Sequence, residues 1–192
     1  MIRVAIAGAA GRMGRTLIEA VNQSGEELTV TAGSVLEDDP ALGIDIGVLS
    51  GGANVGIVTV GNLDQVVDQF DVLIDFTAPD ASLRHLALCQ SHGKALVLGT
   101  TGFSQQEQQQ IASAAEVIPV VFAPNMSVGV NLCLKLLEQA AATLGDDVDI
   151  EIMEAHHRHK KDAPSGTALK MGEVIANQLG RQLDDVAVYG RE

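Results

Sequence analysis

The residues best suited to chemistry lie in one short stretch, residues 154–167, with the sequence EAHHRHKKDAPSGT. Six of its fourteen positions can carry a positive charge, namely His156, His157, Arg158, His159, Lys160 and Lys161. The whole chain has a formal net charge of −13, so this run is a cationic island in an acidic protein. Like charges this dense repel one another, which predicts that an anionic ligand docks on them.

The turn that follows the cationic run suits the same purpose. Pro164, Ser165 and Gly166 lead into a helical pattern over residues 167–179. A helix N-terminus offers free backbone N–H groups and the positive end of a dipole to a carboxylate or phosphate. Histidine and lysine also donate protons near neutral pH. A solvated loop and a metal-binding histidine tract are the alternatives for this stretch taken alone.

A second candidate site opens the chain. Residues 2–7 form an apolar, β-branched run typical of a buried strand. Residues 8–14 read GAAGRMG and precede a helical pattern with an apolar face. A strand, a glycine turn and a helix N-terminus together suit the pyrophosphate of a dinucleotide. The spacing G-x-x-G-x-x-G differs from G-x-G-x-x-G, and the alternative is a glycine turn without a ligand; its position at the start of a strand–helix unit favours the dinucleotide.

A dinucleotide fold needs an acidic residue near the end of its second strand, which binds the adenosine ribose hydroxyls. Residues 28–35 are predicted to form that strand, and Glu37, Asp38 and Asp39 follow it. Glu37 is the best candidate. Three carboxylates would repel a 2′-phosphate, so NADH is expected to serve at least as well as NADPH, although Arg12 partly offsets the repulsion.

Strands and helices alternate through the first 126 residues. Further strands are predicted at 55–60, 72–76, 95–98 and 119–122, and helices at 63–70, 80–92 with Asp80 as N-cap, and 104–115 with a capping box from Ser104 and Glu107. Residues 40–54 hold four glycines and are expected to be a flexible connection. This alternation predicts an α/β fold with a Rossmann-type doubly wound parallel sheet, whose ligands bind at the carboxyl ends of the strands.

The pattern changes after residue 126. A long helix is predicted at 128–144, an alternating half-exposed strand at 149–155, and a helix at 167–179 after the cationic run. We therefore expect two domains, a dinucleotide-binding domain at 1–126 and an α+β substrate and oligomerisation domain at 127–192.

Composition excludes several classes of protein. Aromatic residues make up 3% and Trp is absent, which argues against a stacking platform for nucleic acid. No run of eighteen apolar residues exists, so no membrane span is expected. The two cysteines, Cys89 and Cys133, fall in apolar helical patterns and are predicted to be buried free thiols, as in a reducing, cytoplasmic compartment.

Four segments carry a specific resemblance: IRVAIAGAAGRMG, VLGTTGF, APNMSVGVN and, above all, EAHHRHKKDAPSGTAL. In this order they closely resemble the 4-hydroxy-tetrahydrodipicolinate reductase (dihydrodipicolinate reductase) family of diaminopimelate and lysine biosynthesis. The resemblance implies an N-terminal Rossmann domain, NADH or NADPH as hydride donor, no metal, a small dicarboxylate cyclic imine as substrate, and a homotetramer of the full-length protein.

The resemblance also implies a role for each matching residue. His156 and Lys160 would be the catalytic proton donors, and His157, Gly166 and Thr167 would bind the substrate. The cofactor would be bound by Gly8, Ala9, Ala10, Gly11, Arg12, Met13, Glu37, Gly99, Thr100, Thr101, Ala123, Pro124, Asn125 and Met126. The family continues beyond residue 192, so the chain is expected to be C-terminally incomplete and its substrate domain unfinished.

Other readings of the same residues remain open at this point. His156, His157 and His159 could serve a metal hydrolase, although adjacent histidines on a strand point apart. A dinucleotide-sensing regulator would bind NADH without turnover. A short-chain reductase would need Tyr-x-x-x-Lys, but the single tyrosine is Tyr189.

Overall fold

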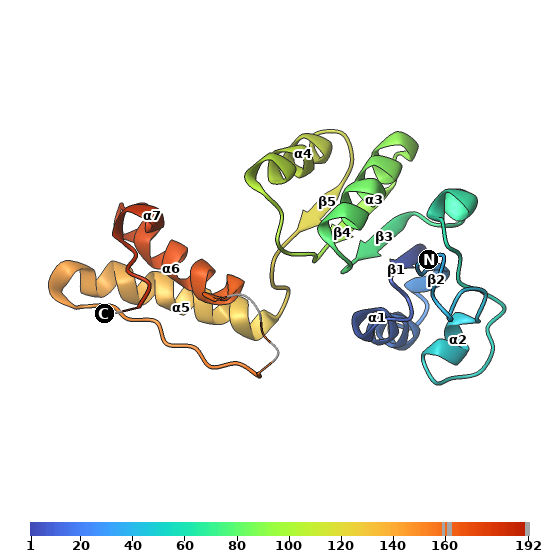
Figure 1. Ribbon diagram of the computed structural model, residues 1–192, viewed down its shortest axis with the longest axis horizontal. Coiled ribbons are helices and arrows are strands. Elements are labelled where there is room, and N and C mark those ends of the chain that lie inside the picture. Colours follow the sequence, from blue (N-terminus) through green and yellow to red (C-terminus); the bar gives the residue numbers. More distant parts are fainter. Residues whose placement is uncertain (159, 161–162, 191–192) are drawn as a thin grey trace. The chain divides into compact units, whose positions relative to one another are not determined.

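The structure, a computed structural model, describes residues 1–158, 160 and 163–190. Internal contacts divide the chain into two compact units, unit 1 (Met1–Ala123) and unit 2 (Pro124–Glu192). The helices and strands of each unit are labelled in Figure 1.

Unit 1 is built on one sheet of five parallel strands in the order β2-β1-β3-β4-β5. The strands are β1 (Ile2–Ala7), β2 (Leu28–Ser34), β3 (Val72–Asp75), β4 (Ala95–Leu98) and β5 (Val120–Phe122). The helices are α1 (Arg12–Gln23), α2 (Ile46–Leu49), the 3₁₀ helix η1 (Leu63–Gln69), α3 (Pro79–His92) and α4 (Gln105–Ala115). The predicted Rossmann-type doubly wound α/β fold is confirmed.

Both faces of this sheet are covered, as a parallel sheet requires. Val4 and Ile6 of β1 pack in one apolar cluster with Ile18 of α1. Ala5 and Ala7 point to the other face, where η1, α3 and α4 pack on the sheet, for example through Cys89 of α3. Each fully buried aliphatic side chain contributes about 1.5–3 kcal/mol. Successive side chains of β1 point to opposite faces of the sheet, so Val4 and Ile6 contact α1 while Ala5 and Ala7 face the helices on the other side.

The strand predicted at 55–60 is wrong, which is why the sheet has five strands rather than six. Residues 55–60 make two isolated bridges, between Ser34 and Val60 and between Asp45 and Val58. The buried carboxylate of Asp45 accepts the backbone N–H groups of Val55, Gly56 and Ile57 at 2.8–3.0 Å. Those backbone N–H groups are therefore not available to hydrogen-bond to a neighbouring strand. The same carboxylate caps α2 through Gly47, so an ordered loop replaces the expected flexible connection.

Helix boundaries in unit 1 otherwise follow the predictions closely. The capping box of α4 is confirmed, since Ser104 Oγ accepts the Glu107 N–H and Glu107 Oε2 accepts the Ser104 N–H. Asp80 is not the N-cap of α3; the helix begins at Pro79, after Ala78, and Asp80 lies in its first turn. Proline fits the first helical position because its missing N–H has no helical partner there.

Unit 2 contains α5 (Val128–Leu144), the 3₁₀ turn η2 (Gly145–Asp147), α6 (Gly166–Gln178) and α7 (Leu183–Val186). The strand predicted at 149–155 is not formed. A strand needs a hydrogen-bonding neighbour, and no strand is present among residues 124–158, 160 and 163–190 to pair with it. Ile150 and Ile152 remain 43% and 41% exposed. The sequence therefore alternates as a strand would, but its apolar side chains are not buried against a core.

The two cysteines differ in environment. Cys89 is fully buried, and burial raises the pKa of its thiol to about 12. Cys133 is exposed on α5, so the prediction that it is buried is wrong. Its surroundings therefore hold the Cys89 thiol in the inert, protonated form.

Candidate functional site

The glycine turn after β1 is shaped for close approach of a ligand to backbone. Gly8 adopts φ +67°, which favours glycine, and its carbonyl accepts the N–H of Gly11. A Cβ at Gly14 would come within 2.2 Å of the Gly8 carbonyl oxygen, so only glycine lets α1 pack this tightly on the turn. Helix α1 begins at Arg12 with no side-chain cap, and Gly11 to Met13 are exposed. Its first N–H groups therefore suit a pyrophosphate, and the turn fits a dinucleotide.

Glu37 lies three residues after the end of β2 with its side chain exposed. Its aliphatic stem packs on Gly61, where a Cβ would lie 2.9 Å from Glu37 Cγ. The carboxylate of Asp39 is already engaged in a local hydrogen bond, because it accepts the N–H of Ala41 at 2.8 Å. Glu37 and Asp38 are thus the carboxylates that remain exposed beyond β2.

The segment after β4 is held close to the sheet. Gly99 lies against the ring of Phe76, to which a Cβ at residue 99 would come within 2.0 Å. Thr100 is buried, at 4% exposure, and Thr101 is exposed. The N–H of Ala123, after β5, donates to the carbonyl of Leu98. Pro124, Asn125 and Met126 belong to unit 2, where Asn125 Oδ1 accepts the N–H of Ser127.

A polar cluster that the sequence patterns did not predict lies at this edge of the sheet. Asp75, the last residue of β3, is fully buried, and His85 of α3 lies 2.7 Å from it through Nδ1. Burial alone would raise the pKa of Asp75, but hydrogen bonds from His85 and Thr77 outweigh burial and hold it below its ordinary value. His85 is the seventh residue of α3, and its position gives no periodic signal of such a partner, because the pair joins two different elements.

The cationic run of unit 2 forms a loop whose two ends are joined. Glu154 Oε1 accepts the N–H of Ser165 at 2.8 Å, and Glu154 Oε2 lies 3.4 Å from His156 Nδ1. The Ser165 hydrogen bond is the main cause that lowers the pKa of Glu154. The Lys160 N–H donates to the His157 carbonyl at 3.1 Å. His159 and Lys161 lie outside the described residues.

Helix α6 begins directly after this loop. Ser165 is its N-cap and accepts the N–H of Ala168, and Gly166 and Thr167 form the first turn. His156, His157 and Lys160 therefore lie in the segment that the Glu154–Ser165 hydrogen bond closes, and Gly166 and Thr167 follow it directly. Cationic groups and a helix N-terminus in one segment are suited to a carboxylate-bearing ligand.

The described residues contain neither a metal-binding cluster nor a membrane-spanning helix. Within residues 1–158, 160 and 163–190, no three His, Cys, Asp or Glu side chains are grouped so that they could hold a metal ion. In the same part of the chain, no helix has the length and apolar character needed to cross a membrane.

The sheet order and the glycine turn make unit 1 a Rossmann-type domain of the dinucleotide-binding class. The family model described as "Dihydrodipicolinate reductase, N-terminus" matches residues 2–126, and the one described as "Dihydrodipicolinate reductase, C-terminus" matches residues 129–189. The chain therefore belongs to the dihydrodipicolinate reductase family.

Solved structures agree with this assignment. A dipicolinate-bound dihydrodipicolinate reductase from Paenisporosarcina sp. TG-14 is 36% identical over 92% of this chain, with a TM-score of 0.73. This chain spans 66% of the length of that protein. The WlbA dehydrogenase from Chromobacterium violaceum, in complex with NADH and UDP-GlcNAcA, is 16% identical, with coverage of 74% and 40% of the two chains and a TM-score of 0.57.

A third similar structure is an oxidoreductase from Agrobacterium radiobacter in complex with NAD+, L-tartaric acid and magnesium. It is 15% identical, with coverage of 74% and 39% of the two chains and a TM-score of 0.52. At 15–16% identity, the likeness to these last two structures concerns the fold alone.

Proposed function

We propose that this protein catalyses the NAD(P)H-dependent reduction of 4-hydroxy-tetrahydrodipicolinate to tetrahydrodipicolinate, in diaminopimelate and lysine biosynthesis. The observation that carries the proposal is the family match over both units, residues 2–126 and 129–189. The family's chemistry also agrees with the site, because a dicarboxylate ring requires cations and helix N–H groups for its two charges.

Unit 1 supplies the cofactor site in this proposal. The N-terminus of α1 and the turn Gly8–Met13 bind the pyrophosphate, Glu37 binds the adenosine ribose, and Gly99, Thr100, Thr101 and Ala123 lie along the nicotinamide half, with Pro124, Asn125 and Met126 from the next segment. The nicotinamide, when bound, supplies the hydride. The exposed carboxylates of Glu37 and Asp38 favour NADH over a cofactor with a 2′-phosphate.

Unit 2 supplies the substrate site and the proton. His157 and the first turn of α6, with Gly166 and Thr167, bind the substrate carboxylates. Hydride addition to a conjugated imine leaves electron density that must be protonated, and His156 and Lys160 are the donors. Glu154 holds the Nδ1 side of the His156 ring, which leaves Nε2 as the nitrogen that can transfer the proton. By the same resemblance, we propose a cytoplasmic, homotetrameric full-length protein that requires no metal.

The decisive test is the oxidation of NADH, and separately of NADPH, in the presence of enzymatically generated 4-hydroxy-tetrahydrodipicolinate. We expect substrate-dependent loss of reduced-nicotinamide absorbance that is insensitive to a chelator, with NADH used at least as well as NADPH. Binding of NADH without any oxidation would instead favour the alternative, a dinucleotide-sensing regulator. Light scattering on the full-length protein tests the homotetramer.

A further inference from the structure

A chain of polar side chains, with Asp75, Ser82 and Thr100 buried, runs along the carboxyl edge of the unit 1 sheet. It starts at Asp75, which is aligned in register with Ala7 of β1 and Leu98 of β4. The Asp75 Oδ1 atom accepts two hydrogen bonds from Thr77, from its N–H at 2.8 Å and from its hydroxyl at 2.6 Å. Asp75 Oδ2 is bonded to His85 Nδ1 at 2.7 Å. One carboxylate thus fixes the turn after β3 to the body of α3.

The chain continues to the turn after β4 through Ser82. Ser82 is fully buried, and its hydroxyl donates to the Thr100 hydroxyl oxygen at 2.8 Å. The Thr77 hydroxyl oxygen lies 3.5 Å from Ser82 Oγ. Thr77 also contacts the first turn, because a Cβ at Gly8 would lie 3.0 Å from Thr77 Cγ2. The turns after β1, β3 and β4 are therefore connected through Asp75, Thr77, Ser82 and Thr100, of which all but Thr77 are buried.

Burying these polar groups has an unfavourable desolvation free energy, so the cluster is not explained by core packing alone. A buried carboxylate is stable only while its partners are in place, and apolar side chains of similar volume would often serve stability as well or better. Each buried side-chain nitrogen and oxygen in the part of the chain that the structure describes has a partner, so the cluster is complete as it stands. What a satisfied polar network adds is directionality, since hydrogen bonds fix the orientation of the turns that they join.

The position of the cluster points to the function of that orientation. The strand order reverses between β1 and β3, where an open α/β sheet binds its ligand. The N-terminus of α1 follows β1, and Glu37 follows β2, so the pyrophosphate and adenosine halves of a dinucleotide fall on that side. The remaining nicotinamide half must then extend over the carboxyl ends of β3 and β4, where Asp75 and Thr100 lie.

We propose that Asp75, His85 and Ser82 are positioning residues that preorganise the turns after β3 and β4 for the nicotinamide half of the dinucleotide. This inference rests on the proposed function, because it requires that unit 1 binds NADH. Ser82 and Asp75 are fully buried and do not reach a ligand themselves, so they act through Thr77 and Thr100. Preorganisation raises affinity by lowering the ordering cost of binding.

The test compares two ligands, NADH and ADP-ribose, which lacks the nicotinamide ring. In Ser82→Ala, we expect the Kd of NADH to rise about fivefold to tenfold, which is the size of one lost hydrogen bond. The Kd of ADP-ribose should stay within about twofold, because its contacts lie on the side of β1 and β2. Fluorescence titration of the full chain gives the first value, and calorimetric titration gives both.

Matched variants separate positioning from general stability. Ser91→Ala, on the same helix, removes an exposed hydroxyl that bonds to the Leu88 carbonyl and to His92 Nδ1, away from the Asp75 cluster, and should change neither Kd. His85→Leu removes the donor to Asp75 and should weaken NADH binding as Ser82→Ala does. His85→Asn places an amide N–H near the position of Nδ1 and should restore part of the affinity.

Each outcome is decisive. Equal changes for NADH and ADP-ribose in the Ser82 and His85 variants, or no change for either, would overturn the positioning role while leaving the proposed function intact. Failure of the wild-type chain to bind NADH at all would overturn the proposed function, and this inference with it.

Discussion

The carboxylate of Glu154 is bonded to the backbone N–H of Ser165 at 2.8 Å, and this one contact closes the cationic loop onto the start of α6. The second oxygen of the same carboxylate lies 3.4 Å from His156 Nδ1. A single side chain therefore sets both the span of the loop and the orientation of the proposed proton donor. It also places a negative charge within the cationic run, which lowers the repulsion among its neighbours.

Glu154→Gln should reduce kcat/KM by about tenfold, because a charge-assisted hydrogen bond is replaced by a weaker neutral one. Trypsin should also cut after Arg158 faster than in the wild type, since the loop is held less firmly. The control is Glu173→Gln, which breaks an exposed pair with Lys170 on α6 and should change neither value. If the two variants behave alike, Glu154 does not orient His156.

His156→Gln should lower kcat by about 10²- to 10⁴-fold, the usual range for a general acid, with little change in the KM for the substrate. Lys160→Ala should act in the same direction. His92→Gln is a suitable control, because His92 ends α3 and bonds to the Leu88 carbonyl. Near-normal turnover in either loop variant, measured by stopped-flow and steady-state assays, would remove that residue from the proposed mechanism.

Gly14→Ala should destabilise unit 1 by about 1–3 kcal/mol, the range for an overpacked site. Its Cβ would come within 2.2 Å of the Gly8 carbonyl oxygen and 2.7 Å of Ala9 Cα, both of them backbone atoms that cannot turn aside. NADH binding should weaken as well, because α1 is pushed away from the pyrophosphate turn. Urea unfolding and NADH titration measure the two effects.

Gly129→Ala is the counterpart to that variant, since Gly129 also lies in a helix but has open space around it. The nearest atom to a Cβ there is Ser127 Oγ at 3.8 Å. Alanine has the higher helix propensity, so stability should rise slightly, by up to about 0.5–1 kcal/mol. A loss of stability in Gly129→Ala equal to that in Gly14→Ala would show that the crowding at Gly8 is not the cause.

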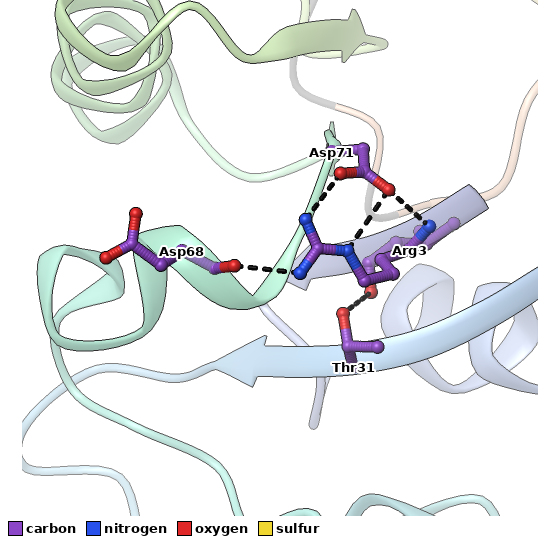
Figure 2. A network of polar contacts seen from close by, with 5 residues as sticks. Arg3, Thr31, Asp68 and Asp71 are labelled. Atoms are coloured by element: carbon purple, nitrogen blue, oxygen red, sulfur yellow. Dashed lines mark hydrogen bonds and ion pairs between the residues drawn. The ribbon is translucent and has the colours of Figure 1, made fainter.

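Asp71→Asn should change the response of the protein to acid. Figure 2 shows Asp71 held by Arg3, through the Arg3 N–H at 2.9 Å and the guanidinium at 2.6 and 3.2 Å. The guanidinium also donates to the Asp68 carbonyl. Hydrogen bonds from Arg3 lower the pKa of Asp71 from 3.8 to about 2.

The pKa shift of Asp71 determines how its contribution to the unfolding free energy changes with pH. A lowered folded-state pKa means that the contribution of Asp71 to stability is fully present above about pH 4 and is lost as the pH falls toward 2. The difference in unfolding free energy between wild type and Asp71→Asn should shrink over that window, and salt should reduce it. In an Arg3→Gln background, Asp71→Asn should produce a smaller pH dependence, because the guanidinium no longer lowers the pKa of Asp71 while the backbone N–H of residue 3 still does. NADH binding should be unaffected, because Arg3 and Asp71 lie at the amino ends of β1 and β3.

Glu37→Gln should raise the KM and Kd for NADH by about tenfold, because a neutral amide binds ribose hydroxyls less strongly than a carboxylate. NADPH should be affected less, or favoured, since one repulsive charge is removed. Asp38→Asn serves as the matched variant on the next residue. Equal effects of the two substitutions on both cofactors would indicate a general electrostatic effect rather than a ribose contact by Glu37.

Several features of the fold could be predicted from the sequence because their causes are local. The strand of β1, its glycine turn and α1 are adjacent in the chain, and their apolar periodicity and φ requirements need no distant partner. The capping box of Ser104 and Glu107 is likewise confined to four residues. The alternation of strands and helices then predicts the parallel sheet, because short βα connections leave few other topologies.

The failed predictions share a different cause. The run at 55–60 and the alternating run at 149–155 both read as strands, yet a strand exists only where another backbone accepts its hydrogen bonds. Asp45, ten to twelve residues earlier in the chain, takes the N–H groups of Val55, Gly56 and Ile57. The hydrophobic periodicity of residues 55–60 does not reveal that a distant carboxylate competes for their backbone N–H groups.

The sequence alone determined the Rossmann-type fold of unit 1, the glycine turn and the cationic run, because each depends on residue types at short spacing. Only the tertiary structure decided which polar groups pair across elements, such as Asp75 with His85 or Arg3 with Asp71. Those pairs join segments that are ten to sixty-eight residues apart. Their free energy depends on burial and on distances that exist only after the chain has folded.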